Sequence, residues 1–250
     1  MTAGSVLVSQ GIVKRFGGFI ALSRIDFEVR EQERVGLIGP NGSGKTTFVN
    51  IISGFVRPDS GRVLFNGKNL IGLPPYRITN LGIGRAFQMV KPFFHLPAYK
   101  NVVVPLFAPR VLASSGGAYG DKDAVALDVL EEVGFERDSS VPYKPASVLP
   151  HGYLKRLELA RLMALKSEVL ILDELFSGLS IAEVTSIIPI IEKLLSEGKT
   201  IIMVEHRLKE LFRIADRVIV LNYGRKIKEG PPKEILEDDA VKKAYLGVEV

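Results

Sequence analysis

Residues 39–47 read Gly-Pro-Asn-Gly-Ser-Gly-Lys-Thr-Thr, and this stretch decides the fold. It fits the pattern of a glycine, four residues, a glycine, a lysine and a serine or threonine that is typical of a phosphate-binding P-loop. The largely apolar residues 34–38 before it predict a short strand, and residues 47–53 after it predict an amphipathic helix. Glycines let backbone N–H groups turn toward phosphate oxygens, and the start of the helix adds its dipole. The segment therefore predicts a nucleotide site.

Two side chains of this loop carry its main chemistry. We expect Lys45 to reach the β- and γ-phosphates of a nucleotide and the hydroxyl of Thr46 to hold Mg²⁺. The alternative is a glycine-rich turn that only resembles the motif, and it is disfavoured because the strand, loop and helix patterns are all in register. The expected ATP-binding residues of the loop are Gly39, Pro40, Asn41, Gly42, Ser43, Gly44, Lys45, Thr46 and Thr47.

A second motif, residues 169–174, reads Val-Leu-Ile-Leu-Asp-Glu. The apolar run predicts a buried strand that delivers two carboxylates at its carboxyl end, where open α/β sheets bind ligands. We expect Asp173 to orient Mg²⁺ and Glu174 to polarise an attacking water as general base. The alternative is a strand that happens to end in exposed acids, and the P-loop upstream disfavours it.

Strand and helix patterns alternate through most of the chain and predict an α/β fold. Residues 1–90 are rich in strands, and residues 156–250 alternate helices with buried strands. Residues 91–155 differ, with several prolines and a Ser-Ser-Gly-Gly spacer at 114–117. We predict one domain over residues 1–250, with a mostly parallel nucleotide-binding sheet and an antiparallel β subdomain in 1–90 and 156–250 and a helical subdomain inserted at 91–155.

Composition and charge narrow the class of protein. The 250 residues contain no cysteine, which excludes disulfides and thiolate metal sites. The N-terminus lacks a signal-peptide pattern and no apolar run approaches the ~20 residues that cross a bilayer, so we expect a soluble, cytoplasmic protein. The net charge of +5 suits nucleic acid, anionic lipid or nucleotide phosphates, but the basic residues are scattered and we expect no nucleic-acid partner.

From about residue 6 to residue 247 the chain resembles the ATP-binding-cassette (ABC) ATPases, in which both motifs occur in this order. The resemblance implies the ABC ATPase fold, ATP hydrolysis as the activity, and ATP and Mg²⁺ as cofactors. Phe16 matches the aromatic residue that stacks on adenine, Gln88 the glutamine that contacts Mg²⁺ and water, and His206 the histidine that contacts the γ-phosphate. The resemblance thus implies Glu174 and His206 as catalytic residues, Phe16 and Gln88 as further ATP-binding residues, and Thr46, Gln88 and Asp173 as metal ligands.

Within that family, residues 15–22, 87–93, 155–161 and 244–247 resemble the ATPase subunits of branched-chain amino acid importers. This implies a second ATPase subunit, membrane permease subunits and an external solute-binding protein as partners, and a place on the inner face of the cell membrane. ATPases of urea import and lipopolysaccharide export look similar in these segments and remain alternatives, as does a non-transport ABC ATPase. No sustained heptads or second cassette support a DNA-repair or translation ATPase. A regulatory module without turnover is disfavoured by the intact Glu174 and His206.

The segment that follows Gln88, about residues 89–99, is expected to couple the ATPase to its membrane partner. Its apolar and aromatic side chains form either an exposed docking surface or the core of the helical subdomain, and the sequence leaves both open. These side chains are Phe93, Phe94, Leu96 and Tyr99.

Three positions depart from the family pattern. The family signature, Leu-Ser-Gly-Gly-Gln or a close variant, is expected to open a helix, but here this segment reads Leu149, Pro150, His151, Gly152 and Tyr153. Pro150 lacks the serine hydroxyl that donates to the γ-phosphate held by the opposite subunit, and it lacks a backbone N–H. In addition, Ser180 stands where Asp is common and Leu175 where Pro is common.

The signature and the loop of Ser180 serve mainly the partner's nucleotide in the family's dimer, whereas the residues that serve the chain's own nucleotide are intact. The resemblance therefore implies a subunit that can hydrolyse the nucleotide bound to its own P-loop but contributes poorly to hydrolysis of the nucleotide bound by its partner. This favours a heterodimer over a homodimer. Drift in a tolerant homodimer and a degenerate, slow paralogue remain alternatives.

Overall fold

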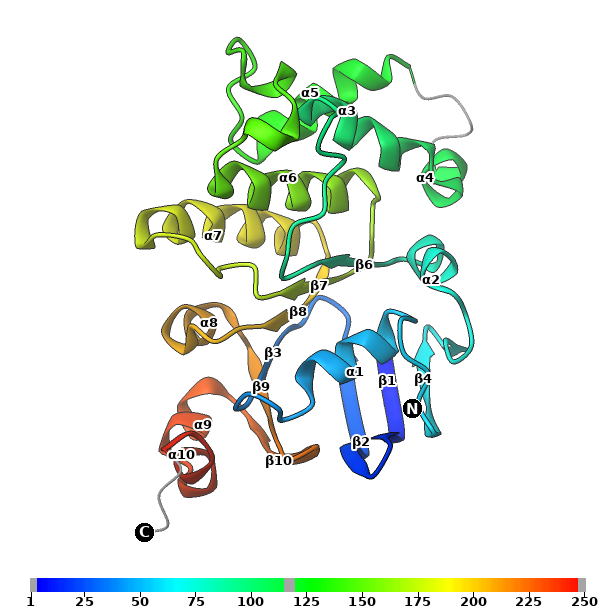
Figure 1. Ribbon diagram of the computed structural model, residues 1–250, viewed down its shortest axis with the longest axis vertical. Helices are drawn as coiled ribbons and strands as arrows, with labels where there is room; N and C mark the ends of the chain where they lie inside the picture. The colour runs from blue at the N-terminus through cyan, green and yellow to red at the C-terminus, as the bar shows by residue number, and fades with distance from the viewer. Residues whose placement is uncertain (1–3, 115–119, 247–250) are drawn as a thin grey trace. The chain divides into compact units, whose positions relative to one another are not determined.

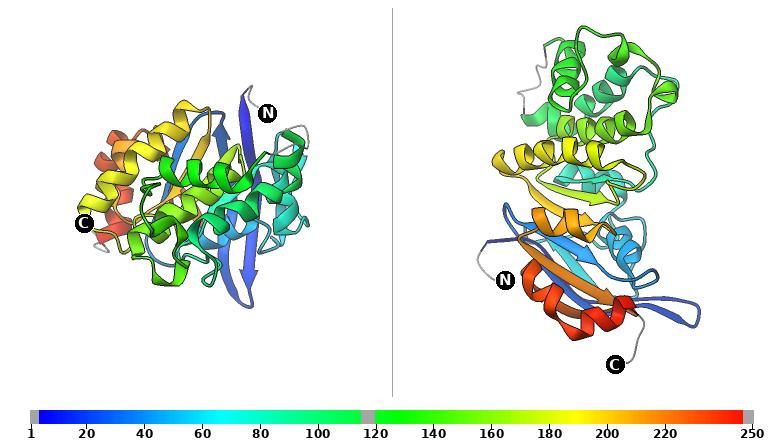
Figure 2. Two further views of the ribbon diagram at one scale, coloured as in Figure 1. Left: turned by 90° about the horizontal axis from the view of Figure 1, so that it is seen from above. Right: turned by 90° about the vertical axis from the view of Figure 1, so that its left-hand side faces the viewer.

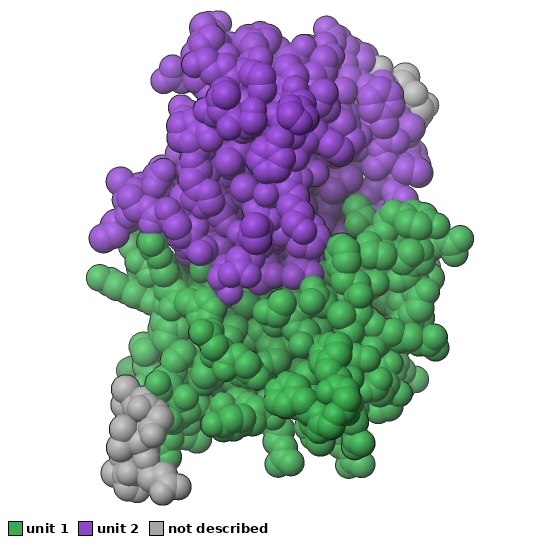
Figure 3. Space-filling model, viewed as in Figure 1, with its two compact units in different colours: residues 1–79, 198–250 green, residues 80–197 purple. Residues whose placement is uncertain are grey.

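The computed structural model describes residues 4–114 and 120–246, and the chain divides into two compact units (Figure 3). Unit 1 combines residues 1–79 and 198–250, and unit 2 is residues 80–197. The predicted spacer at 114–117 lies outside the described residues except for Ser114, which ends a helix. The predicted helical subdomain lies within unit 2, and its independence stays a prediction.

In unit 1, strands β10, β9, β3 and β8 lie side by side in that order (Figure 1). β3 pairs in parallel with β8 and β9, and β10 pairs antiparallel with β9. β8 is buried along its whole length and β3 along all but its first residue, as is typical of apolar strands covered on both faces. The bounds are β3, Arg34–Ile38; β8, Thr200–Val204; β9, Arg217–Asn222; and β10, Arg225–Gly230.

A second sheet of unit 1 is antiparallel, with the strand order β2, β1, β4, β5. The long strands β1 and β2 are joined by a hairpin in which Phe16 faces Phe19. This sheet confirms the predicted antiparallel β region. The bounds are β1, Ser5–Phe16; β2, Phe19–Arg30; β4, Ser60–Phe65; and β5, Lys68–Asn69.

The helices of unit 1 cover both sides of the parallel strands. α1 lies on one side, and α8, α9 and α10 lie on the other (Figure 2). A Cβ at Gly36 of β3 would lie 3.0 Å from the Leu211 side chain of α8, so glycine allows the helix to approach the strand. The bounds are α1, Lys45–Ile52; α8, Leu208–Ile214; α9, Pro232–Glu237; and α10, Asp239–Leu246. A further helix, α2, Pro75–Leu81, begins in unit 1 and ends in unit 2.

Unit 2 contains the parallel pair β6 and β7 and a group of helices. β7, Val169–Asp173, is fully buried, and it extends the predicted strand by the aspartate at its end. α3, α5 and α6 pack against one another, and Asp121 caps α5 by accepting from the N–H groups of two residues in its first turn. The other bounds are β6, Ile83–Ala86; α3, Ala98–Val103; η1, Val104–Phe107; α4, Pro109–Ser114; α5, Lys122–Glu132; η2, Val141–Tyr143; η3, Ala146–Val148; α6, His151–Ala164; and α7, Ile181–Ser196.

Across residues 4–114 and 120–246, none of the helices has the length and apolar character that crossing a membrane requires.

Candidate functional site

The P-loop joins β3 to α1 in unit 1, as the sequence predicted. Two of its glycines occupy positions that no other residue could take. A Cβ at Gly39 would lie 2.1 Å from the carbonyl oxygen of Leu221, and one at Gly44 would lie 2.7 Å from that of Ala21. Both glycines also have positive φ angles, of 150° and 106°. The loop therefore packs tightly against its own unit, and its shape depends on missing side chains.

Lys45 and Thr46 begin α1 at the end of this loop. The ammonium of Lys45 donates to the carbonyl oxygens of Gly39, at 2.7 Å, and Pro40, at 3.0 Å. Its side chain is buried, whereas Thr46 is exposed. No acidic residue stands in the first turn of α1, so nothing there offsets the positive end of the helix dipole. This loop fits the phosphates of a nucleotide, and the Thr46 hydroxyl is a suitable oxygen ligand for Mg²⁺.

Phe16 and His206, which the sequence placed in the same site, also belong to unit 1. Phe16 ends β1 with its ring half exposed, and the ammonium of Lys14 lies 5.1 Å from the ring centroid. A cation over one face leaves the other face to stack on a base. His206 follows β8 and is exposed, whereas Glu205 beside it is buried. Both placements agree with solvent-accessible ligand-binding roles.

A contact that the sequence did not predict ties α10 to the P-loop. Tyr245 of α10 and Ile38 of β3 line one apolar groove of about 220 Å³. Burial raises the pKa of Tyr245 to about 12, although a hydrogen bond with the backbone of Gly39 opposes the shift. The C-terminal helix thus contacts the residue that opens the loop.

Unit 2 brings together Gln88, Asp173 and Glu174, whose roles the sequence had assigned. Asp173 forms a buried ion pair with Arg85, with 2.6 Å between Nη2 and Oδ2. The amide Nε2 of Gln88 donates to Oε2 of Glu174 at 2.7 Å. Glu174 has a φ of 49°, which is uncommon for a residue with a side chain and is often found at functional sites.

Lys155 of α6 fixes the backbone of this cluster, a role that the sequence pattern did not predict. The side chain is almost fully buried, and its ammonium donates to the carbonyl oxygens of Gln88, at 3.0 Å, and Glu174, at 3.2 Å. A buried ammonium needs such partners because burial without them is costly. The signal in the sequence was a lysine in a helix whose buried face is apolar apart from Lys155 and Glu158.

The altered signature opens α6, as expected, and Pro150 is the N-cap residue, just before the first turn. It provides no side-chain cap, and the buried Gly152 lies in the first turn. A Cβ at Gly152 would lie 2.4 Å from a carboxylate oxygen of Glu183 in α7. His151 Nε2 lies 3.2 Å from the carbonyl oxygen of Ser177. The signature segment is therefore packed against the loop that precedes α7.

Ser180 is the N-cap of α7, and it forms a capping box with Glu183. The Ser180 hydroxyl accepts from the Glu183 N–H at 3.2 Å, and the Glu183 carboxylate accepts from the Ser180 N–H at 2.8 Å. The backbone N–H and hydroxyl of Ser180, with His151 and Arg156 nearby, lower the pKa of Glu183. Serine thus performs locally the helix-capping function that an aspartate also provides.

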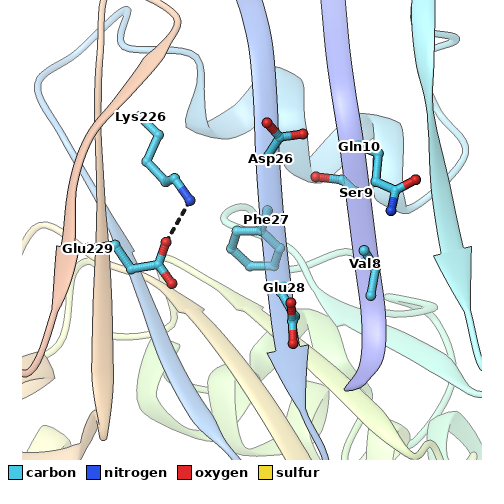
Figure 4. A pocket seen from close by; sticks show the side chains of 8 residues that line it. All are labelled: Val8, Ser9, Gln10, Asp26, Phe27, Glu28, Lys226 and Glu229. Atoms are coloured by element: carbon cyan, nitrogen blue, oxygen red, sulfur yellow. Dashed lines mark hydrogen bonds and ion pairs between the residues drawn. The ribbon is translucent and has the colours of Figure 1, made fainter. Parts of the chain in front are cut away.

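A separate hollow of unit 1, of about 350 Å³, is lined by residues of β1, β2 and β10 (Figure 4). Lys226 donates to Glu229 at 2.6 Å, and Asp26 accepts from the Gly11 N–H at 2.7 Å. Glu28 accepts from the hydroxyl of Ser5. Because these charged groups already have partners, we assign no ligand to the hollow.

Two family models match the chain. The model described as ABC transporter matches residues 22–177, and the model described as branched-chain amino acid ATP-binding cassette transporter matches residues 225–250. The second match covers β10, α9 and α10.

Several proteins resemble the chain over nearly its whole length. The high-affinity branched-chain amino acid transport ATP-binding protein BraF of Pseudomonas aeruginosa is 33% identical, over 97% of this chain and 98% of that protein. The protein of the same description named LivG, from Salmonella typhimurium, is 35% identical over the same shares. A probable LivG of Archaeoglobus fulgidus is 33% identical, over 98% of this chain and 96% of that protein.

Solved structures show the same fold. MJ1267, an ATP-binding cassette of an ABC transporter in an ADP conformation, superimposes with a TM-score of 0.85 at 28% identity, over 98% of this chain and 99% of that chain. The dimeric cassette MJ0796 in a post-hydrolysis state with ADP and Pi gives 0.79 at 25% identity, over 90% and 98%.

Proposed function

Because the chain belongs to the ATP-binding subunits of the ABC transporter family, we propose that its P-loop holds ATP and that Glu174 is the general base for hydrolysis. The observation that carries this proposal is the P-loop itself. Its glycines Gly39 and Gly44 leave no space for a side chain, and Lys45 is held at its centre. Such a loop selects phosphates because it presents N–H groups and one fixed cation.

Each residue has a defined task in this reaction. Lys45 neutralises charge on the β- and γ-phosphates, and Phe16 stacks on the base. When bound, Mg²⁺ would supply positive charge to the phosphate oxygens, and Thr46, Asp173 and Gln88 would hold it. Glu174 takes a proton from the attacking water as the water oxygen bonds to the γ-phosphorus, the bond from that phosphorus to the β–γ bridging oxygen breaks, and ADP leaves. His206 donates to the γ-phosphate.

The cluster around Glu174 supports the role of general base. A base must stay within hydrogen-bond reach of its water, so its position has to be fixed. Gln88 fixes the carboxylate of Glu174, and Lys155 fixes the carbonyl groups of both residues. Movement of Gln88 is therefore linked to the position of the base, which couples hydrolysis to the segment that follows Gln88.

The transported solute is proposed from the relatives. The proteins BraF and LivG are described as branched-chain amino acid transport proteins, and the C-terminal match carries the same description. We infer that this subunit powers import of branched-chain amino acids, together with permease subunits and an external solute-binding protein. It then works at the cytoplasmic face of the membrane.

The surface that contacts the permease is assigned to residues 89–99. Phe93 and Phe94 in this segment are 47% and 45% exposed, which favours a docking surface over a core. The amide of Asn101 shapes the segment by accepting from the Phe93 N–H at 2.7 Å. Large exposed aromatic side chains on a fixed backbone suit a protein interface.

The ATPase partner is assigned to a different subunit with an intact signature. Pro150 leaves α6 without a side-chain cap, and no serine hydroxyl is available there for the partner's γ-phosphate. A heterodimer would combine this chain's P-loop with the partner's intact signature, which gives one complete site.

Reconstitution tests the proposal. The chain is co-expressed with a candidate partner ATPase and permeases, the complex is placed in proteoliposomes, and ATP hydrolysis and leucine uptake are measured with the solute-binding protein present. We expect both, and we expect Phe93→Glu with Phe94→Glu to block assembly while ATP binding by the isolated subunit persists. Phe107→Glu changes a still more exposed aromatic of unit 2 outside the segment and should assemble normally.

Two outcomes would contradict this account. Stimulated ATP hydrolysis without uptake of any branched-chain amino acid would overturn the assigned solute. If the double variant loses both ATP binding and assembly, Phe93 and Phe94 belong to the core of unit 2.

A further inference from the structure

An unusual turn joins β9 to β10 in unit 1. Asn222 pairs with Arg225, so the turn has only two residues, Tyr223 and Gly224. Their φ angles are 44° and 71°, both positive, as in a type I′ turn. Asparagine or aspartate is preferred at the first of these positions, and a bulky residue there is strained.

The backbone of this turn is fixed against the P-loop. The N–H of Gly224 donates to the carbonyl oxygen of Ser43 at 3.0 Å, and its carbonyl oxygen accepts from the N–H of Ser23 at 2.7 Å. A Cβ at Gly44 would lie 3.6 Å from the Cα of Gly224. The turn is therefore a neighbour of the residues that are expected to hold phosphate.

Burial does not explain why a tyrosine occupies the strained position. The residue is 85% exposed, so its ring gains little from packing within the unit. The two-residue hairpin requires the positive φ but not a tyrosine at this position, and residues held in strained conformations are common at functional sites. An exposed aromatic ring on a turn whose backbone contacts the P-loop is also well suited to stack on a planar or apolar part of the ligand.

The position of Phe16 defines where that part of the ligand lies. Phe16 pairs with Phe19 at the start of β2, and Ser23, which contacts the turn, lies four residues further along the strand. Four residues of a strand span about 13 Å. A nucleotide with its phosphates in the P-loop and its base on Phe16 follows this stretch, so its nucleoside passes the turn.

We propose that Tyr223 makes a second aromatic contact with the nucleoside of the bound nucleotide, in addition to Phe16. The inference rests on the proposed ATP site. Stacking accepts any base, so Tyr223 strengthens the binding of nucleotides in general and does not select adenine. Its contribution is absent for a ligand that has phosphates but no nucleoside.

Three ligands and two variants test this contact. Isothermal titration of the isolated subunit measures affinity for ATP, GTP and inorganic tripolyphosphate. Tyr223→Asn removes the ring and places a preferred residue in the turn, so we expect a higher melting temperature. We also expect ATP and GTP to bind about 5- to 10-fold more weakly, which corresponds to about 1–1.4 kcal/mol. Tripolyphosphate affinity should not change. Tyr223→Phe keeps the ring and should behave as the wild type.

The controls separate this inference from the nucleotide site itself. Lys45→Ala should weaken all three ligands together. If the wild type binds none of them, the P-loop assignment fails, and with it the role of Tyr223. If ATP affinity is unchanged in Tyr223→Asn, the role of Tyr223 is overturned and the P-loop assignment stands. The same holds if the affinities for ATP and tripolyphosphate fall by the same factor. A lower melting temperature for Tyr223→Asn would equally overturn it, because the strain would then not exist.

Discussion

Lys45 is the residue on which nucleotide binding most depends. Its ammonium is held between the carbonyl oxygens of Gly39 and Pro40, so it is positioned before it meets a phosphate. We expect Lys45→Ala to weaken ATP binding by about 10- to 150-fold, because a hydrogen bond to a charged group contributes about 1.5–3 kcal/mol. Equilibrium titration with a fluorescent ATP analogue measures the change.

An exposed lysine of the same unit provides the control for Lys45. Lys68→Ala removes an equal charge from β5 and should leave ATP affinity as in the wild type. Circular dichroism of both variants should match the wild type. Wild-type ATP affinity in Lys45→Ala would contradict the assignment of Lys45 as a phosphate contact.

The sequence predicted the residues expected to act on the ligand, but not the residues that fix those residues in position. Lys45, Asp173 and Glu174 stand in motifs whose spacing expresses their chemistry directly. Arg85 and Lys155 could not be predicted, because each meets its partner across a long separation in sequence: 88 residues for Arg85 and Asp173, and 67 for Lys155 and Gln88. Such pairs depend on how strands and helices pack, which a local pattern does not contain.

At the scale of single elements, the start of α7 depends on one serine. Ser180 stands where the family commonly has Asp, and the structure shows that its hydroxyl caps the helix. We expect Ser180→Ala to lower the free energy of unfolding by about 1 kcal/mol, as loss of an N-cap does. Ser180→Asp keeps a capping oxygen and should be close to wild type. Urea denaturation measures both, and equal stability of the two variants would contradict a capping role.

A second element-scale contact joins β3 to the residue before β9. Arg34 donates to both carboxylate oxygens of Asp216, at 2.6 Å and 3.0 Å. Burial raises the pKa of Asp216, but the side-chain and backbone hydrogen bonds from Arg34 outweigh it, and the pKa is lowered overall from 3.8. A lowered pKa in the folded state stabilises the protein above 3.8, and this stabilisation is lost as the pH falls through the folded value.

Asp216→Asn tests this pH dependence. Both partners are partly exposed, so we expect a loss of only about 0.5–1 kcal/mol at pH 7. The difference from wild type should shrink as the pH falls below 4 and vanish when Asp216 is protonated in both states. Urea denaturation across the pH range measures it. A difference that stays constant down to the lowest pH would show that the carboxylate charge is not its cause.

At the scale of the whole molecule, the predicted ABC ATPase fold and family are confirmed, and so is the ATPase activity that they carry. The fold and family followed from the resemblance of the two phosphate-site motifs to the family, whereas the alternation of apolar strands with helices predicted only the mostly parallel sheet. Strands β3 and β7 begin and end within a residue of the predicted runs. The contact of Tyr245 with Gly39 was beyond prediction, because it joins the C-terminal helix to the P-loop through tertiary packing alone.

We propose that the hydrolytic residues of this chain act on its own nucleotide, whereas its altered signature contributes poorly to the partner's site. In a heterodimer with a subunit of intact signature, the site built on this chain's P-loop is then the productive one. The site built on the partner's P-loop and on residues 149–153 binds ATP and turns over slowly. Helix α6 still offers its dipole there, but Pro150 offers neither a hydroxyl nor an N–H.

The most direct test is the rate of ATP hydrolysis by the reconstituted heterodimer with its permeases, measured with one catalytic glutamate replaced at a time. Glu174→Gln in this chain keeps the shape of the side chain but removes the base, so we expect the rate to fall below about a tenth of wild type. The matching change in the partner should leave more than about half of the rate. Equal losses from the two substitutions would contradict the account and would make the altered signature a tolerated change.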